Sequence, residues 1–398
     1  MVPSIHKFSI LGLLADDLVF DSRAKRAFSA LSDQSNLMVL CYDRNPDSAI
    51  SWNYKVEKVS ASGALSRFLK LTIGGIARAW RQRPDLIYAE GLLPLVSGAF
   101  AKAFSGAKLV YDARELYLLD DKGESTYGPV HRLLEGLFIR FADLVLSPNE
   151  ERAQFMAQFY KKYSLNFQVL KNIPPVIQAP NLSATNSWRT RLKLGPDDKL
   201  VVYQGAIGVT RGLDKILGAI PHTPQQIHYL FVIPENDLAG FNESLPDAIK
   251  NRVHTSPFLG LETLRGLLAE ADAGIVVYNL KGLNNKFCAP NKLYEYSQMQ
   301  LPMLTSPQPL FQKVQQKYHT CEVVDESTWE KGDHKKIAEH LLNLLNRSSD
   351  QMNFKEFNQD NNWPDQKQQF LKNIHALLSI SKKSQRPKAS SNTQWETL

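Results

Sequence analysis

The stretch Ala289–Tyr296 (APNKLYEY) constrains the fold most, because it lies between two short apolar runs. The runs Ala273–Tyr278 (AGIVVY) and Leu301–Thr305 (LPMLT) are rich in branched residues and bounded by turn residues, which is the pattern of buried strands. Between them, Pro290 and Asn291 are typical of a helix start. The sequence therefore predicts a strand–helix–strand unit, with the helix beginning at the mouth of a parallel sheet, where anions bind.

The start of this helix has the chemistry of an anion site. The backbone N–H groups from Asn291 to Leu293 would point towards the anion, and Lys292 would add a mobile positive charge. Glu295 lies one turn further along, where its carboxylate would accept hydrogen bonds from a vicinal diol such as a nucleotide ribose. These residues favour a site for a sugar nucleotide. The alternative is an ordinary helix that presents Glu295 to solvent.

The run Asn291–Tyr296, followed by a short helix and then by Leu301-Pro302, resembles the donor-site helix of GT-B glycosyltransferases. The resemblance is closest to the retaining family 4 enzymes, of the bacterial polysaccharide and glycolipid type. It implies that Glu295 holds the ribose of the donor. It also implies two Rossmann-like α/β domains, each doubly wound around a parallel sheet, with an interdomain cleft between them.

The bulk properties of the chain agree with this fold class. A chain of 398 residues suits two α/β domains, and 43% hydrophobic with 22% charged residues is typical of a globular protein. The three cysteines show no metal-ligand or redox spacing, and we expect no metal site. Without a signal-peptide layout or a bilayer-spanning apolar run, we expect a soluble cytoplasmic protein.

The predicted boundaries follow the composition of the chain. We expect a Rossmann-like acceptor-binding domain over residues 1–178 and a Rossmann-like nucleotide-sugar-binding domain over residues 198–347. A helical segment over residues 348–380 would cross back to the first domain. Residues 381–398 are rich in Lys and Ser, and we expect a disordered tail there.

Two strands of the first domain end in candidate acceptor-side residues. One ends at Glu90, and the next, Lys108–Tyr111, runs into Asp112-Ala113-Arg114-Glu115. The pair resembles the N-terminal domain of family 4 enzymes, in which the second strand commonly ends in an Asp-Ala-His-Glu-like run. Arg114 stands where the family has a histidine near the transferred sugar. It would hold an anionic sugar or an acceptor phosphate by a forked contact, or it is a surface residue.

The loop after the first predicted strand supplies Asp21 and Arg23, just before a predicted helix over Ala24–Ser32. Such a loop is where an α/β domain usually binds its ligand, so both residues are candidates for the acceptor side of the cleft. The equal alternative is a helix N-cap with a charged first turn. The loop lacks the Gly-rich fingerprint of a dinucleotide-binding domain, so we expect no nicotinamide cofactor and no cofactor beyond the donor substrate itself.

The segment Gly63–Gln82 predicts a basic amphipathic helix with a break at Gly74-Gly75, and Pro129–Phe141 predicts a second apolar and basic helix. A sheet-covering helix with a solvated basic face is the simpler interpretation. The alternative is a peripheral contact with anionic lipid at the inner face of a membrane. The net charge of +7 suits an anionic substrate or membrane, and the absence of a nucleic-acid-binding motif argues against nucleic acid.

The second domain begins with a strand, Lys199–Gln204, a turn at Gly205 and a helix after Arg211-Gly212. Family 4 enzymes usually have Gly-Arg-Leu, three residues and then Lys-Gly here. In this register Gly205 keeps the glycine, Ala206 replaces the first arginine and Arg211 replaces the lysine. Arg211 would carry most of the charge that faces the diphosphate, with help from Lys292. The alternative is that Arg211 faces water at a helix start.

Two further positions bear on the donor site. Phe258 and Leu259 lie in the loop that faces the nucleotide base in GT-B enzymes, and a buried structural role for Phe258 is equally compatible with the sequence. Many family 4 enzymes carry two glutamates eight positions apart, but the position eight before Glu295 is Phe287. This departure leaves no obvious carboxylate near the anomeric carbon.

Together these patterns predict a metal-independent glycosyltransferase that moves a sugar from a UDP- or GDP-linked donor to a glycan or lipid-linked acceptor, with retention. Arg211, Lys292 and Arg114 are the predicted catalytic residues. Two alternatives stay open: a catalytically silent partner subunit with the same fold, favoured by Phe287, Ala206 and Arg114, and a sugar-nucleotide epimerase.

Overall fold

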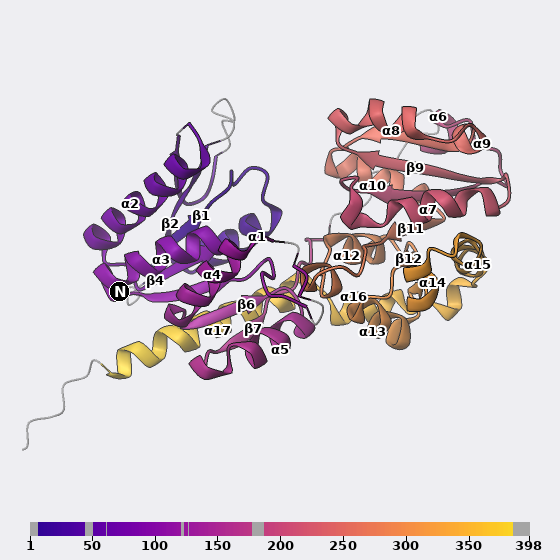
Figure 1. The fold of residues 1–398 in the computed structure, drawn as a ribbon. Coiled ribbons are helices and arrows are strands. Elements are labelled where there is room, and N and C mark those ends of the chain that lie inside the picture. The colour runs from indigo at the N-terminus through magenta and orange to yellow at the C-terminus, as the bar shows by residue number, and fades with distance from the viewer. Residues whose placement is uncertain are drawn as a thin grey trace, which may run out of the picture.

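The computed structural model describes residues 7–43, 51–60, 62–120, 123–125, 127–176 and 187–384. These residues form two parallel sheets, each covered by helices on both faces (Figure 1). The predicted fold class is therefore confirmed. The predicted disordered tail begins too early, because residues 381–384 belong to the last helix. Residues 385–398 of that tail lie outside the described residues, as do residues 177–186 between the two sheets.

The first sheet has seven parallel strands in the order β3-β2-β1-β4-β5-β6-β7. Its strands are β1 (Phe8–Leu14), β2 (Ser35–Tyr42), β3 (Lys55–Val59), β4 (Leu86–Glu90), β5 (Lys108–Asp112), β6 (Leu144–Ser147) and β7 (Phe167–Val169). The helices of this domain are α1 (Ser22–Ser32), α2 (Ala64–Gln82), α3 (Leu92–Ser105), α4 (Pro129–Phe138) and α5 (Glu150–Phe159). Helices α2, α3 and α4 cover one face, whereas α1 covers the other.

The second sheet has six parallel strands in the order β10-β9-β8-β11-β12-β13. Its strands are β8 (Lys199–Gln204), β9 (Ile227–Ile233), β10 (Val253–Pro257), β11 (Ala273–Val276), β12 (Met303–Thr305) and β13 (Cys321–Val323). One face packs on α7 (Leu213–Ala219), α8 (Leu238–Ser244), α9 (Asp247–Lys250), α14 (Glu326–Lys331) and α15 (His334–Leu345). The other packs on α6 (Trp188–Arg191), α10 (Leu261–Glu270), α12 (Asn291–Gln298), α13 (Pro309–Tyr318) and α16 (Phe354–Asp360).

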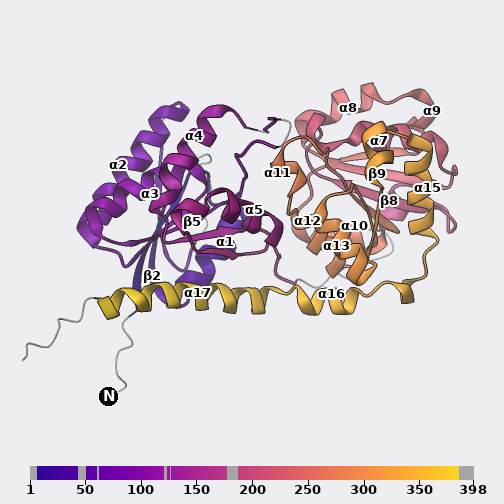
Figure 2. The ribbon, with the colours of Figure 1, turned by 60° about the horizontal axis from the view of Figure 1, so that its bottom comes forward.

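The C-terminal segment connects the two domains along one side of the molecule. Helix α16 packs on the second sheet, and α17 (Trp363–Ser384) continues beneath the first (Figure 2). Phe370 and Ile374 of α17 are buried in the same cluster as α1. The stripe of apolar residues along α17 therefore fixes the second domain to the first by burying hydrophobic surface.

Local sequence explains the ends of several elements. Asp21 caps α1 by accepting a hydrogen bond from the Ala24 amide at 2.9 Å, so α1 begins two residues before the predicted start. Helix α2 is continuous through Gly74 and Gly75, where a break was predicted. Gly74 lies close to Leu40 and Gly75 packs against Leu13, so close packing on the sheet explains these glycines. No described helix is long and apolar enough to cross a membrane.

Glu135 is a fully buried acid of α4, one of the helices that cover the first sheet. It accepts hydrogen bonds from the hydroxyls of Tyr111 at 2.8 Å and Tyr160 at 2.9 Å. Burial raises the pKa of Glu135 from 4.5 to about 7, and the two tyrosines oppose this rise only in part. The folded protein therefore retains a proton on Glu135 over a pH range in which the unfolded chain has lost it.

We expect Glu135→Gln to reduce the pH dependence of stability. Because the folded pKa is raised, the wild-type advantage is present at low pH and is lost as pH rises towards 7. The free energy of unfolding of the wild type, relative to the variant, should fall by about 3 kcal/mol between pH 4.5 and 7.5. Urea unfolding of both proteins at several pH values measures this difference in free energy. A pH-independent difference would contradict the assignment.

Candidate functional site

Residues that follow β5 and β6 of the first sheet and β8 and β11 of the second line one interdomain crevice, at which α12 begins. Helix α12 lies on the side of the second domain that faces the first (Figure 1). Several hydrogen bonds cross the crevice. Asn172 of the first domain donates to the Ala289 carbonyl at 2.7 Å, and Asn291 donates to the Ser22 hydroxyl at 3.3 Å. The predicted helix start therefore lies against the first domain, in the position where α/β proteins bind ligands.

Lys292 lies over the end of β8. Its ammonium nitrogen is 4.6 Å from the centre of the Tyr203 ring. Gly205 follows the strand with φ +142°, and a Cβ atom at this position would lie 2.8 Å from Lys292 Nζ. The backbone conformation therefore favours glycine here, and a larger residue would also displace the lysine ammonium. Burial, followed by the nearby Arg211 charge, lowers the pKa of Lys292 to about 7.

Arg211 reaches the same place from the loop before α7. Its guanidinium carbon is 4.8 Å from the centre of the Tyr278 ring, and Lys292 Nζ is 6.0 Å from that centre. Two cations that repel each other thus lie over the Tyr278 ring, and cation–π contacts with this ring offset part of their repulsion. A bound polyanion such as a diphosphate would relieve this repulsion.

Glu295 lies one turn along α12 and is half-buried. Burial raises its pKa, whereas the neighbouring charges of Lys292, Arg26 and Arg265 oppose this rise. Arg26 belongs to α1 of the first domain and was not predicted from the sequence, because nothing distinguishes it from a surface residue of an amphipathic helix. Its Nη2 is buried without a hydrogen-bond partner among the described residues. The carboxylate of Glu295 is thus available at the edge of the crevice.

The other predicted donor-site residues differ in their surroundings. The Leu293 side chain is buried in the core of the second domain, so only its backbone can face the crevice. The Leu293 amide donates a hydrogen bond to the Pro290 carbonyl at 3.3 Å. Phe258 is 55% exposed at the end of β10, which is contrary to a buried structural role. Leu259 is partly buried against the second core.

Arg23 and Glu90 lie in a buried charge network at the ends of β4 and β5. Arg23 donates to both oxygens of Asp112 at 2.6–3.1 Å and to the Leu170 carbonyl at 2.7 Å, and its Nε is 3.8 Å from Glu90. The Tyr88 hydroxyl also donates to Asp112 at 2.6 Å. Arg23 thus organises the sheet edge, and its guanidinium has little capacity left for an acceptor.

Arg114 lies above this network and closer to the crevice. It forms an ion pair with Asp21 and lies 4.0 Å from Glu90, whose carboxylate oxygens have no hydrogen-bond partner among the described residues. Burial, and then the negative charge of Asp112, raises the pKa of Glu90 well above its ordinary value. Arg114 is one-third exposed, so one side of its guanidinium faces the cavity.

The crevice contains a cavity of about 270 Å³ between the two domains, lined by Arg114 from one side and by Arg211 and Tyr278 from the other. A second cavity, of about 280 Å³, lies within the first domain and is lined by Asp16 and Glu90 among others. Three residues line both cavities: Arg114, Glu115 and Tyr127. The two cavities are therefore neighbours.

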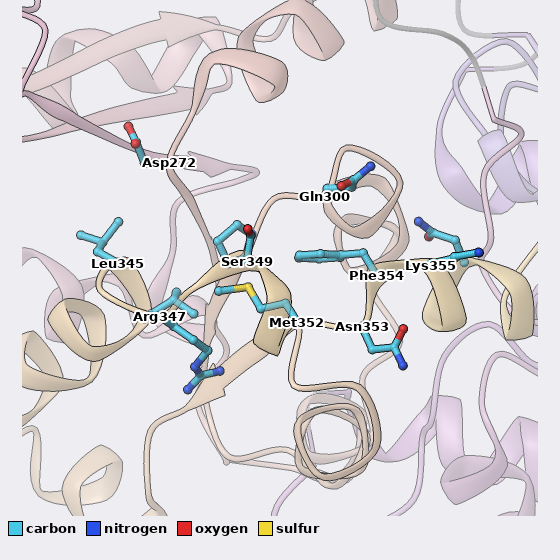
Figure 3. A pocket seen from close by; sticks show the side chains of 12 residues that line it. Asp272, Gln300, Leu345, Arg347, Ser349, Met352, Asn353, Phe354 and Lys355 are labelled. Carbon is cyan, nitrogen blue, oxygen red and sulfur yellow. The ribbon is translucent and has the colours of Figure 1, made fainter.

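A larger cavity, of about 520 Å³, lies away from this crevice (Figure 3). Its lining includes Asp272 and Pro302, which precede β11 and β12, so it faces the amino ends of the strands. Ligands of α/β sheets bind at the opposite edge. Among the residues that the structure describes, no group of three or more His, Cys, Asp and Glu side chains has the arrangement of a metal site.

No protein-family model matches the chain, and a search of curated proteins finds no match. Solved structures do match along most of their length. Anabaena Alr3699/HepE, in complex with UDP and glucose, is 16% identical, with a TM-score of 0.66 over 92% of this chain and 99% of that chain. Sucrose-phosphate synthase (tll1590) from Thermosynechococcus elongatus is 14% identical, with a TM-score of 0.70 over 94% and 100% of the two chains.

The chain has the GT-B fold. The same fold occurs in the UDP-GlcNAc 2-epimerase from Methanocaldococcus jannaschii, which is 10% identical with a TM-score of 0.58 over 92% of this chain and 99% of that chain. At these identities the comparison establishes the architecture alone.

Proposed function

We propose that this protein is a glycosyltransferase, similar to family 4, that transfers a sugar from a nucleotide-diphosphate donor to a hydroxyl of a glycan or lipid-linked acceptor, with retention. One observation carries the proposal. Lys292 and Arg211 converge on Tyr278 at the start of α12, and Glu295 lies one turn beyond. Two cations beside a helix start suit a diphosphate, and a carboxylate one turn away suits a ribose diol.

The proposed mechanism needs little acid–base chemistry from the protein. Arg211 and Lys292 neutralise the charge that develops on the leaving diphosphate, which is the step that electrostatic preorganisation accelerates. The leaving diphosphate accepts the proton of the acceptor hydroxyl as the new glycosidic bond forms. Arg114 holds the acceptor or the transferred sugar from the first domain. The proposal includes neither a metal ion nor a cofactor.

The solved structures support the donor class. HepE was crystallised with UDP and with UDP-glucose, and its fold matches that of this chain over 92% of the residues. A panel of UDP- and GDP-linked sugars, tested by thermal shift and by donor hydrolysis, checks the proposal. Binding followed by turnover with a glycan or lipid-linked acceptor is expected. Failure of every nucleotide and nucleotide sugar to bind would refute it.

Two rival functions keep specific support. Phe287 replaces a family glutamate, which favours a catalytically silent partner subunit. The epimerase with the same fold favours epimerisation of a nucleotide sugar. Tight donor binding without turnover, even with lipid-linked acceptors, would favour the silent subunit. Interconversion of two nucleotide sugars without an acceptor would favour the epimerase.

Glu295→Ala is expected to weaken binding of UDP or GDP about tenfold to a hundredfold, because hydrogen bonds to a carboxylate contribute about 1.5–3 kcal/mol. The nearby charges of Arg26 and Arg265 would also lose their partner. Isothermal titration calorimetry with both nucleotides measures this effect. Glu270→Ala, at the far end of α10, removes the same charge outside the crevice and serves as the control. Unchanged affinity in Glu295→Ala would exclude the ribose contact.

The proposal places the protein in the cytoplasm with a peripheral contact to anionic membrane. The α2–α4 face supports this contact: α2, α3, α4 and residues 139–141 form one continuous helical layer. Its exposed large apolar side chains are Leu65, Leu69, Ile73, Trp80, Phe100, Phe104, Val130, Leu133, Leu137 and Phe141. The one acid in these segments, Glu135, is fully buried, whereas basic residues such as Lys70, Arg81, Arg132 and Arg140 flank the apolar ones.

The Leu69→Glu/Trp80→Glu double variant is expected to reduce binding to phosphatidylglycerol vesicles at least tenfold, because both changes remove apolar area and add repulsion. Co-sedimentation at low and high salt measures the loss. Phe159→Glu, at an equally exposed aromatic of α5 outside this face, is the control. If wild type and double variant bind anionic and neutral vesicles equally, the proposed membrane contact is wrong.

A further inference from the structure

Glu115 lies at the junction of the two cavities in the crevice. It follows β5 by three residues and lines both the interdomain cavity of about 270 Å³ and the first-domain cavity of about 280 Å³. Among the residues that line the interdomain cavity, it is the one carboxylate. Tyr127 lines the same two cavities. No ion pair of Glu115 within 4.0 Å occurs among the described residues.

The loop before α12 supplies no acid to this cavity. Phe287 turns towards the first domain, where its ring lies 5.4 Å from that of Phe155. The side-chain oxygen of Asn284 accepts hydrogen bonds from the Leu116 amide and from Arg152, both at 3.0 Å. Asn285 donates to Asn279 and Lys281. The Asn284 side chain therefore binds the first domain, and the Asn285 side chain holds the loop itself.

Arginines line the interdomain cavity from both sides, Arg114 and Arg152 from the first domain and Arg211 from the second. Arg211 and Tyr278 line it from the second domain, next to the place where the diphosphate is proposed to bind. A ligand group attached to that diphosphate would project from Arg211 across the cavity towards Glu115. The cavity volume is at the lower end of the range for small-molecule sites and suits a single sugar ring better than a whole nucleotide sugar.

We propose that Glu115 binds the hydroxyls of the transferred sugar. The inference rests on the proposed function, because it takes the diphosphate site as given. A carboxylate accepts two hydrogen bonds from adjacent hydroxyls of a sugar ring. Glu115 thus supplies from the first domain the acid that position 287 lacks. Because the two ends of the donor then contact different domains, the sugar is recognised only in the closed crevice.

The test compares a nucleotide sugar with its bare nucleotide. Glu115→Gln should weaken binding of UDP-glucose, or of GDP-mannose if the protein prefers guanine, about tenfold or more, while binding of UDP or GDP changes less than twofold. Isothermal titration calorimetry on the full chain measures all four ligands. Glu115→Asp should give an intermediate loss, because it keeps the charge but shortens the reach. Glu124→Gln, outside both cavities, is the control.

Equal affinities of wild type and Glu115→Gln for the nucleotide sugar would overturn the inference, as would an equal loss for nucleotide and nucleotide sugar. A wild type that binds neither nucleotides nor nucleotide sugars refutes the proposed function instead, so the two failures are distinguishable. Thermal unfolding of each variant shows whether it is folded. Should Glu115→Gln be unfolded, Glu115→Asp provides the second variant. It should weaken the nucleotide sugar about threefold and leave the nucleotide unchanged, and no such difference would count against the inference.

Discussion

Replacement of Lys292 by methionine is expected to weaken binding of a nucleotide sugar about a hundredfold. The ammonium group lies beside Gly205 and above Tyr203, where a diphosphate would contact it directly. A charge-assisted hydrogen bond to phosphate in a half-buried site contributes about 2–3 kcal/mol, which corresponds to this factor. Methionine keeps the apolar stem of the lysine, so its packing on Tyr203 is retained and the loss reports on charge.

The pH dependence of the same binding reaction provides a more specific measurement. The pKa of Lys292 is lowered to about 7, chiefly by burial and then by Arg211. The free site loses its charge above pH 7, whereas the diphosphate complex retains it, so binding at higher pH takes up a proton. Affinity for a UDP-linked sugar, whose diphosphate does not titrate in this range, should fall roughly 25-fold between pH 6.5 and 8.5.

Calorimetry in two buffers of different ionisation enthalpy measures the proton uptake directly. The Lys292→Met variant should show neither the uptake nor the fall in affinity. Lys250→Met removes an equal charge from the exposed helix α9 and should bind the donor as the wild type does. A pH-independent affinity in the wild type would mean that Lys292 is not the titrating group at the diphosphate.

The sequence predicted the fold and part of the site for an identifiable reason. Buried parallel strands appear as short apolar runs, and the residues after them converge at one sheet edge. Gly205, Arg211, Lys292 and Glu295 follow strands of a single sheet, so their chain positions suffice to bring them together. The role of Arg23 was less predictable, because only the folded structure shows that its guanidinium is hydrogen bonded to Asp112.

The residues that the first domain contributes to the site could not be predicted in this way. Arg26 belongs to an amphipathic helix, and its proximity to Glu295 depends on how the two domains are docked. The same applies to Glu115, which the sequence places only in a loop. Periodicity determines which face of an element is buried, but it contains no information on the relative position of two separately folded sheets.

The docking of the domains depends on Arg152 of α5, which is 2% exposed. Its guanidinium donates to the carbonyl of Arg114 at 2.6 Å and, across the interface, to those of Asn284 at 3.2 Å and Phe287 at 3.1 Å. Asn149 adds two hydrogen bonds to the same loop at 3.1 Å each. A buried cation thus satisfies the backbone of the segment that leads into α12.

Arg152→Met is expected to destabilise the protein by about 3–5 kcal/mol, because it leaves several buried carbonyl groups without their donor. The loss should be concentrated at the interface. Hydrogen exchange of residues 283–289 is therefore expected to accelerate more than that of the β8 core. Arg191→Met, at a cation of the short helix α6 in the second domain, is the control. Exchange that rises equally in both domains would show that Arg152 stabilises the whole protein and has no particular effect on the interface. A selective rise would mean that the start of α12, and with it Lys292, is positioned from the other side of the crevice.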